Sequence, residues 1–509
     1  MRGDGDGVGN AERDQEADTL PFHGELGVIE WMILTSSMAM ATVVEHSTIS
    51  PPPDSNVPAE LSLPVVFFDM VWYDYAANQS VLFFDFPGCS KSHFLDTIVP
   101  DLKRSLSLTL AQYLPLSGKI IHPTAPGNKP LIRYQSGDSV SFLVSESSAE
   151  FSHLTGSQPR PCEEFYAFAP GLPPATRSED SVSCPVLALQ VTLFPGQGLC
   201  IGFVTHHAVA DASTVVSFIR AWALINSSKP GGDVIHDRLA QANCLPFYDR
   251  QNVTNVNGLD SIYWDLIVEL SCTVEPPPVK IPTGKLRATF VLKRDEINSL
   301  KDLVLARSSG PTDVPHLSSF TVVCALVWVC SARGDEVTDD DETEYFGFVA
   351  DCRARLEPAM PVNYFGNCVA LVKAELKHGE VKKGGPEGFV KAAKAIGEAI
   401  KERVYNENGI LCGAEKWPEE FGKLIGKRQY GVAGSPRFDF YAADYGWGKA
   451  KKFEALFIDD GAALSLCKSR DFEGGLEIGL SKPMAQMDAF SRVFREVLCE
   501  LCCSSNQKA

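Results

Sequence analysis

A chain of 509 residues is too long for one compact core, so its length suggests two domains of ordinary size. The formal net charge of -18 argues against a nucleic-acid partner, because phosphate binding depends on clustered Lys and Arg. Fifteen scattered cysteines do not form a small disulfide scaffold and fit a reduced, cytoplasmic compartment. The CxxC at Cys499 and Cys502 has no further ligands of zinc-site spacing, so we expect no metal.

The first residues, Met1 to about Pro21, are rich in Gly, Asp and Glu and are expected to be disordered. The moderately apolar stretch 26–44 is interrupted by Glu30 and has no basic region or cleavage site of a signal peptide, so we expect no membrane anchor. The folded part is predicted to begin near Val43. Residues 1–42 would then be a disordered extension, or the true start would be Met38 or Met40.

Hydrophobic patterns over the rest of the chain predict mixed α/β structure. In a first domain, 43–230, strands are expected at 64–68, 80–84, 131–134, 140–144 and 186–194, and a helix at 95–114. A stretch rich in Pro, Gly, Asn and Asp at 231–257 is interpreted as the crossover linker. In a second domain, 258–509, we expect a strand at 285–292, helices at 294–305, 389–404 and 484–501, a buried helix at 320–330 and a solvated acidic loop at 335–344.

A pair of histidines lies at a predicted strand-to-helix junction. Residues 199–205 form an apolar run typical of a buried strand, and from Val215 the apolar positions follow a helical period. His206, His207 and Asp211 lie between the two, where rigid supports can hold a polar side chain at the edge of a cavity. A purely structural interpretation is also open, with Asp211 as an N-cap and the histidines satisfied in the core.

Further motifs accompany this junction. The stretch HAVAD (207–211) is followed by DCRARL (351–356), NYFGNC (363–368), GSPRFD (434–439) and DYGWG (444–448). Together, in this order, they closely resemble the plant BAHD acyltransferases, whose two signatures are HxxxD and DFGWG. The resemblance runs from about Val43 to the C-terminus, and NYFGNC resembles the branch that acylates anthocyanins, flavonoids and phenolic glycosides. Tyr445 replaces the usual Phe, which is a mild change.

The resemblance implies a two-domain fold like that of chloramphenicol acetyltransferase, in which each domain is a mixed β-sheet flanked by helices and a channel runs between them. It also implies transfer of an acyl group from an acyl-CoA cosubstrate, with no bound cofactor, to a hydroxyl of a phenolic acceptor. His207 would be the general base and Asp444 a weaker catalytic candidate. Asp211 would point away from the base and shape the loop through Arg353. Tyr445, Gly446, Trp447 and Gly448 would form a supporting turn, Ser435 is an oxyanion candidate, and Lys285, Ser318 and Ser319 would bind CoA.

The acyl group and the acceptor stay open at this point. Malonyl-using members of the resembled branch commonly carry an arginine eight residues after the histidine, where this chain has Val215. A buried malonyl carboxylate needs a cationic partner, so the sequence leaves malonyl and hydroxycinnamoyl groups as alternatives. An amine acceptor, or a non-catalytic protein that binds acyl-CoA or a phenolic compound, are further alternatives. A hydrolase has little support, since no GxSxG motif occurs. We expect a cytoplasmic monomer.

Overall fold

The computed structural model describes residues 40–506, apart from residues 54–56, 126, 229–231, 309–315, 337–338 and 462. The expectations for the first 39 residues, including the disordered stretch and the possible start at Met38, therefore lie outside the described residues. Among the described residues the first regular element is β1 (Thr42–Ile49), close to the predicted start of the folded part.

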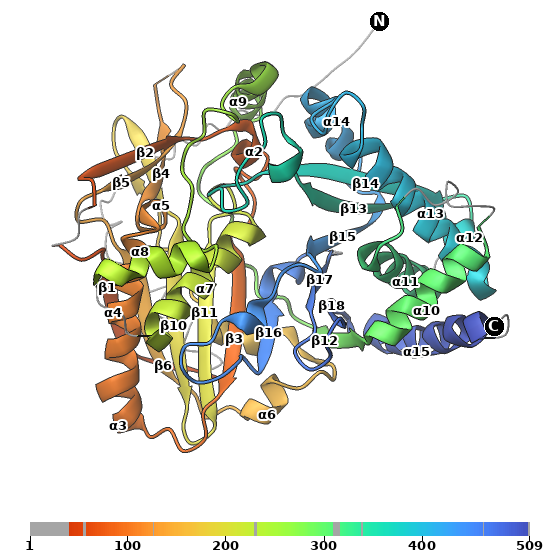
Figure 1. Ribbon diagram of the computed structural model, residues 1–509, viewed down its shortest axis with the longest axis horizontal. Coiled ribbons are helices and arrows are strands. Elements are labelled where there is room, and N and C mark those ends of the chain that lie inside the picture. Colours follow the sequence, from red (N-terminus) through yellow and green to blue (C-terminus); the bar gives the residue numbers. More distant parts are fainter. Residues whose placement is uncertain are drawn as a thin grey trace, which may run out of the picture. The chain divides into compact units, whose positions relative to one another are not determined.

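A six-stranded sheet forms the centre of the first half of the chain. Its strand order is β1, β6 (Val140–Glu146), β10 (Leu187–Phe194), β11 (Gly198–Thr205), β3 (Asn78–Asp85) and β16 (Lys452–Ala455). Both β10 and β11 are buried along their whole length, as their continuous apolar sequences predict. The helices α4 (Val99–Leu110) and α7 (Ala212–Ser228) pack against each other beside this sheet (Figure 1).

A smaller, five-stranded sheet lies in the same half. Its order is β2 (Glu60–Pro64), β5 (Leu131–Gln135), β4 (Lys119–Pro123), β9 (Ser181–Pro185) and β8 (Thr176–Arg177). The prediction of a strand at 64–68 is wrong, because β2 ends at Pro64 and a short helix, α2 (Phe67–Met70), follows. The Asp69 carboxylate accepts the Val66 N–H at 3.3 Å and so favours a helical turn over an extended chain.

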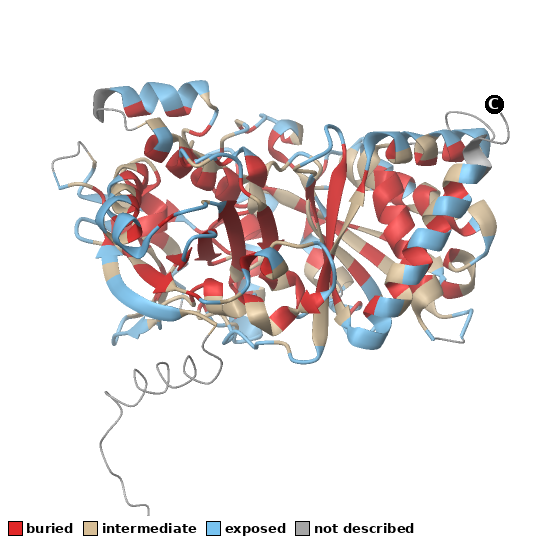
Figure 2. Ribbon diagram, turned by 90° about the horizontal axis from the view of Figure 1, so that it is seen from below, coloured by how far each residue is buried: buried red, intermediate tan, exposed pale blue. Residues whose placement is uncertain are grey.

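The second half is organised around a seven-stranded sheet. Its order is β14 (Val369–Lys377), β13 (Thr343–Asp351), β15 (Arg428–Gly434), β17 (Ala463–Lys468), β18 (Leu476–Pro483), β12 (Lys285–Leu292) and β7 (Arg160–Pro161). The helices that pack with it are α10 (Arg294–Ala306), α11 (Ser319–Gly334), α13 (Gly385–Val404) and α15 (Met484–Asn506). Figure 2 shows their buried residues facing the sheet and their exposed residues facing outward.

The acidic stretch at 335–344 is only partly the solvated loop that its charge predicts. Glu344 lies inside β13 and is fully buried. Its carboxylate accepts a hydrogen bond from Trp328 Nε1 at 2.7 Å and lies 2.5 Å from His378 Nδ1, so specific partners offset the cost of burying it.

Each of the two large sheets contains a strand from the other half of the chain. β16 pairs with β3, and β7 pairs with β12. The predicted linker at 231–257 is not irregular throughout, since it contains α8 (Gly232–Gln241). After it, α9 (Leu259–Glu269) packs against α2 of the first half.

Short elements complete the described structure. The predicted helix at 95–114 is divided into a π-helical turn (Phe94–Ile98), α4 and α5 (Leu114–Ser117). The other short helices are α3 (Lys91–His93), α6 (Phe151–Leu154), α12 (His378–Val381) and α14 (Trp417–Gly422), and 3-10 turns occur at Cys162–Phe168, Val256–Gly258, Arg353–Arg355, Ala414–Lys416, Phe440–Ala442 and Leu456–Ile458. None of the helices within the described ranges has the length and apolar character needed to span a bilayer.

Candidate active site

The first histidine of the pair, His206, is a fully buried structural residue. Its Nε2 lies 2.7 Å from the Val274 carbonyl oxygen, and its Nδ1 accepts the Ala208 N–H at 3.2 Å. These two partners require the proton to sit on Nε2. Burial lowers the pKa of His206 to about 4, so the ring is neutral at neutral pH. Both nitrogens are therefore occupied within the fold.

The second histidine, His207, is only half-buried and its ring is available. Its Nδ1 is buried and has no hydrogen-bond partner, so Nε2 is the nitrogen left to meet a substrate. Burial lowers the pKa of His207 to about 4, and the neutral ring can accept a proton at neutral pH. The Trp72 indole stacks on the imidazole, with 4.1 Å between the ring centroids and 3° between the planes.

Asp211 turns away from the imidazole towards Arg353. The Arg353 Nη1 lies 2.9 Å from Asp211 Oδ2, and Nη2 donates to Oδ1 at 3.1 Å. Oδ1 also accepts the Thr214 N–H at 3.0 Å, which caps the start of α7. Burial opposes the charge of Arg353, but the Asp211 carboxylate outweighs it and raises the guanidinium pKa. Because α7 belongs to the first half and Arg353 follows β13, this ion pair joins the two halves.

A second buried carboxylate, Asp69 of α2, organises the His207 segment, and the sequence analysis missed it. Asp69 Oδ1 accepts the Asn367 N–H at 3.1 Å and the Asn367 side-chain amide at 3.0 Å. That amide group also donates to the His207 carbonyl oxygen at 2.9 Å. Arg250 Nη1 neutralises Asp69 at 2.6 Å. Asn367 lies within the NYFGNC motif, which was the one available signal, whereas nothing in the local sequence marks Asp69, Arg250 or Trp72.

The DYGWG turn lies at the other end of α7. Asp444 Oδ1 accepts the N–H groups of Gly446 and Gly448 at 2.8 and 2.9 Å, and both glycines have positive φ angles of 97° and 90°. Asn226, near the end of α7, donates to the Tyr445 carbonyl oxygen at 2.7 Å.

His207 precedes α7, so this 17-residue helix separates it from the turn by about 25 Å. The structure therefore does not bring Asp444, an exposed carboxylate, to His207, and the catalytic candidacy of Asp444 has no geometric support.

The aromatic residues of that turn are packed into the core. The Tyr445 ring meets Trp222 of α7 edge to face at 5.0 Å and stacks on Trp447 at 5.4 Å. The Tyr445 hydroxyl is buried without a hydrogen-bond partner. A Phe at this position would make the same ring contacts, which explains why the Tyr in this motif is tolerated structurally.

Ser435 lies at the edge of the large second sheet that faces the site. β13 and β15 run parallel, and antiparallel β14 starts where they end. The residues that follow β13 and β15 and precede β14 therefore share one edge, and they include Arg353, Ser435 and Asn367. The Ser435 hydroxyl oxygen accepts the Arg437 N–H at 3.2 Å.

The candidate CoA residues are divided between two ends of that sheet. Lys285 begins β12 and donates to the Asp459 carbonyl oxygen. Ser318 caps α11 by accepting the Thr321 N–H at 3.2 Å, and Ser319 accepts from Lys301 at 3.0 Å. The pairings between β13, β15, β17, β18 and β12 show that β12 and β13 run in the same direction, so Lys285 lies at the end of the sheet where β13 starts. The helix α11 begins at the opposite end, near the end of β13, where Phe320 packs on Phe348. Only an extended ligand could contact both Lys285 and the serines.

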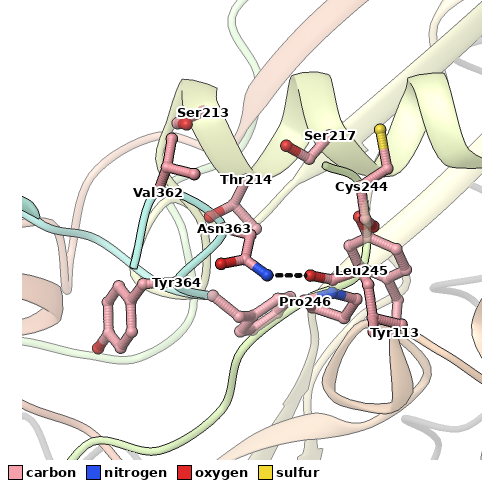
Figure 3. A pocket seen from close by; sticks show the side chains of 11 residues that line it. Tyr113, Ser213, Thr214, Ser217, Cys244, Leu245, Pro246, Val362, Asn363 and Tyr364 are labelled. Carbon is pink, nitrogen blue, oxygen red and sulfur yellow. Dashed lines mark hydrogen bonds between the residues drawn. The ribbon is translucent and has the colours of Figure 1, made fainter. Parts of the chain in front are cut away.

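A small hollow, partly open to solvent, lies beside the site rather than over the imidazole. It is lined by the first turns of α7, residues 244–246 and residues 362–365, and His207 is not among its lining residues. Figure 3 shows Asn363 bridging its floor by donating to the Leu245 carbonyl oxygen at 2.5 Å. Over the described ranges, no three His, Cys, Asp or Glu side chains gather as a metal site requires.

Comparison with known proteins gives consistent matches over nearly the whole chain. The family model described as "Transferase family" matches residues 39–497. The chain is 43% identical to phenolic glucoside malonyltransferase 1 of Nicotiana tabacum, over 84% of this chain and 92% of the relative. It is 40% identical to malonyl-coenzyme:anthocyanin 5-O-glucoside-6'''-O-malonyltransferase of Salvia splendens, over 89% and 95%. The crystal structure of vinorine synthase matches with a TM-score of 0.61 and 18% identity, covering 91% of this chain and all (100%) of that one. The predicted two-domain acyltransferase fold is thereby confirmed.

Proposed function

The chain belongs to the Transferase family and is an acyltransferase of the BAHD type, and from that premise we propose that it transfers an acyl group from acyl-CoA to a sugar hydroxyl of a phenolic glucoside. The observation that carries the proposal is His207, a neutral, half-buried imidazole whose Nε2 is left for a substrate and whose main chain is held from the second half of the chain. The two relatives named above act on glucosides of this kind.

In the proposed reaction, His207 Nε2 removes the proton from the acceptor hydroxyl as its oxygen attacks the thioester carbonyl carbon. The tetrahedral intermediate then collapses, the C–S bond breaks, and the CoA thiolate takes the proton from His207. Ser435 is the proposed donor to the oxyanion, because its strand end shares an edge with Arg353 and Asn367.

The remaining motif residues have proposed positioning or binding roles. Asp211 and Arg353 fix the loop that carries His207, and the turn from Asp444 to Gly448 supports the end of α7. For acyl-CoA, Lys285 and the pair of Ser318 and Ser319 are the proposed contacts at opposite ends of an extended ligand. The protein is proposed to work as a cytoplasmic monomer, which its scattered, mostly buried cysteines and its single-chain site support.

Two acyl donors are to be compared. The names of the relatives favour malonyl-CoA, whereas the apolar Val215, which follows the histidine by eight residues, favours an uncharged group such as coumaroyl. The test incubates wild type and His207→Ala with malonyl-CoA or coumaroyl-CoA and a phenolic glucoside, its aglycone or a matched amine. Free thiol and acylated product are measured.

Glucoside-dependent thiol release that His207→Ala loses supports the proposal. Product formed only with the amine would favour an N-acyltransferase. Binding without thiol release for every pair would favour a non-catalytic binding protein.

A further inference from the structure

The face of the His207 imidazole is covered by an aromatic pair from the segment after α2. Trp72 stacks flat on the imidazole at 4.1 Å. Tyr75, which is 53% exposed, stands edge to face against Trp72 at 5.1 Å and against His207 at 6.4 Å. The Trp72 Nε1 atom is buried without a hydrogen-bond partner, so no side-chain hydrogen bond ties the indole to another group.

Both rings are tethered to the same residue by separate routes. The main-chain N–H of Trp72 donates to the Asp69 carbonyl oxygen at 3.0 Å. The His207 carbonyl oxygen accepts from Asn367, whose amide group is bonded to the Asp69 carboxylate. Arg250 holds that carboxylate in place at 2.6 Å. Asp69 therefore sets the position of the indole relative to the imidazole.

Proton abstraction creates a positive charge on His207 that the Asp211 carboxylate favours only through space, without a hydrogen bond to the ring. The Asp211 oxygens are engaged by Arg353 and by main-chain N–H groups, and the neighbouring His206 is neutral. Nδ1 of His207 makes no regular hydrogen bond, and the polar groups that favour the charged ring at close range, its own main-chain carbonyl and the Asn367 side chain, are uncharged. The electron-rich face of an indole attracts a cation within about 6 Å of the ring centroid, and the stack satisfies this distance.

We propose that Trp72 is a positioning residue whose indole face stabilises the imidazolium formed on His207 when the acceptor hydroxyl loses its proton. It takes the place of the carboxylate that orients a catalytic histidine in a triad. The step balances within the reaction described above: the O–H bond breaks, an N–H bond forms on Nε2, and the proton leaves with the CoA thiolate. The inference rests on the proposed function for its kinetic consequence, but the contact itself can be tested without turnover.

The kinetic test compares Trp72→Phe, which keeps an aromatic face, with Trp72→Leu, which keeps only apolar cover. Because the charge forms in the transition state, Trp72→Leu should lower kcat by about 2- to 30-fold with KM unchanged. Trp72→Phe should stay nearer to wild type. Trp264→Leu is the matched control, since Trp264 packs edge to face on Tyr73 in the same region. Equal kcat values for Trp72→Phe and Trp72→Leu at equal thermal stability would overturn the proposal.

The second test needs no substrate. Protonation of a stacked imidazole quenches indole fluorescence, so wild type should show a quenching step with a midpoint near pH 4, the pKa to which burial lowers His207. The step should be missing in His207→Gln and in Trp72→Phe. A wild-type titration identical to that of His207→Gln would overturn the proposal. If wild type transfers no acyl group but shows this step, the proposed function fails and the proposed contact stands.

Discussion

Substitutions in the ion pair between Asp211 and Arg353 test whether Asp211 stabilises the fold or takes part in catalysis. In Asp211→Asn the side chain keeps its shape and still accepts the Thr214 N–H, so the cap of α7 survives. The change removes the charge that balances Arg353, which is 2% exposed. Breaking a buried ion pair from one side costs about 3–5 kcal/mol. Asp351, 3.1 Å from Arg353 Nη1, remains as a partial partner, so we expect a loss of about 3 kcal/mol, at the lower end.

The assay is urea unfolding of wild type, Asp211→Asn, Asp211→Ala and Arg353→Met, with kcat measured well below each unfolding midpoint. Asp211→Ala should lose about 1 kcal/mol more than Asp211→Asn, because it also loses the cap. The double variant Asp211→Asn/Arg353→Met should be more stable than the sum of the single losses predicts. Turnover per folded molecule should change only a few-fold. An unchanged unfolding free energy in Asp211→Asn together with a loss of turnover of 100-fold or more, on the order of a general-base defect, would refute the positioning role.

Three further predictions concern neighbouring groups. His207→Ala should lower kcat by about 10²- to 10⁴-fold, the usual contribution of a general base, and retained turnover would rule out that role. Burial lowers the pKa of His206 to about 4 in the folded protein, whereas the pKa in the unfolded chain is about 6.5. Between these two pH values the unfolded chain therefore binds a proton that the folded protein does not bind. The contribution of neutral His206 to the free energy of unfolding should be complete above pH 6.5 and fall by about 3 kcal/mol towards pH 4. His207 adds a fall of its own over the same range, so urea titrations of His206→Gln should show a shallower slope than wild type. Asp444→Ala should lower thermal stability through the loss of two turn hydrogen bonds and leave kcat unchanged; a kcat loss at equal stability would contradict this.

The junction that carries the base could be predicted because its signals are local. Residues 199–205 fall within β11, and the helical period after Val215 belongs to α7. The helix begins three residues earlier, at Ala212, because the Asp211 carboxylate caps it. His207 therefore follows from strand and helix patterning together with the motif order.

The contacts that position the base could not be predicted, because they join distant segments. Asp69 meets Asn367 across 298 positions and Arg250 across 181, and no periodicity reports such pairs. The same limit explains the wrong strand at 64–68, since a run of apolar residues does not show that Asp69 will turn the chain into a short helix. It also explains why the burial of Glu344 was not predicted, because its partners Trp328 and His378 lie on other elements, 16 and 34 positions away.

The two long-range pairs that hold the His207 loop, Asp211 with Arg353 and Asp69 with Asn367, share one physical feature, which is that each joins the two halves of the chain. Asp211 and Asp69 come from the first half, and Arg353 and Asn367 come from the second. A buried carboxylate without its partner is costly, so neither half can present the His207 loop in this conformation on its own. The imidazole and its stacked indole both lie in the first half, but the His207 carbonyl is held by Asn367 from the second. The His207 loop is therefore held in this conformation only when the two halves are joined.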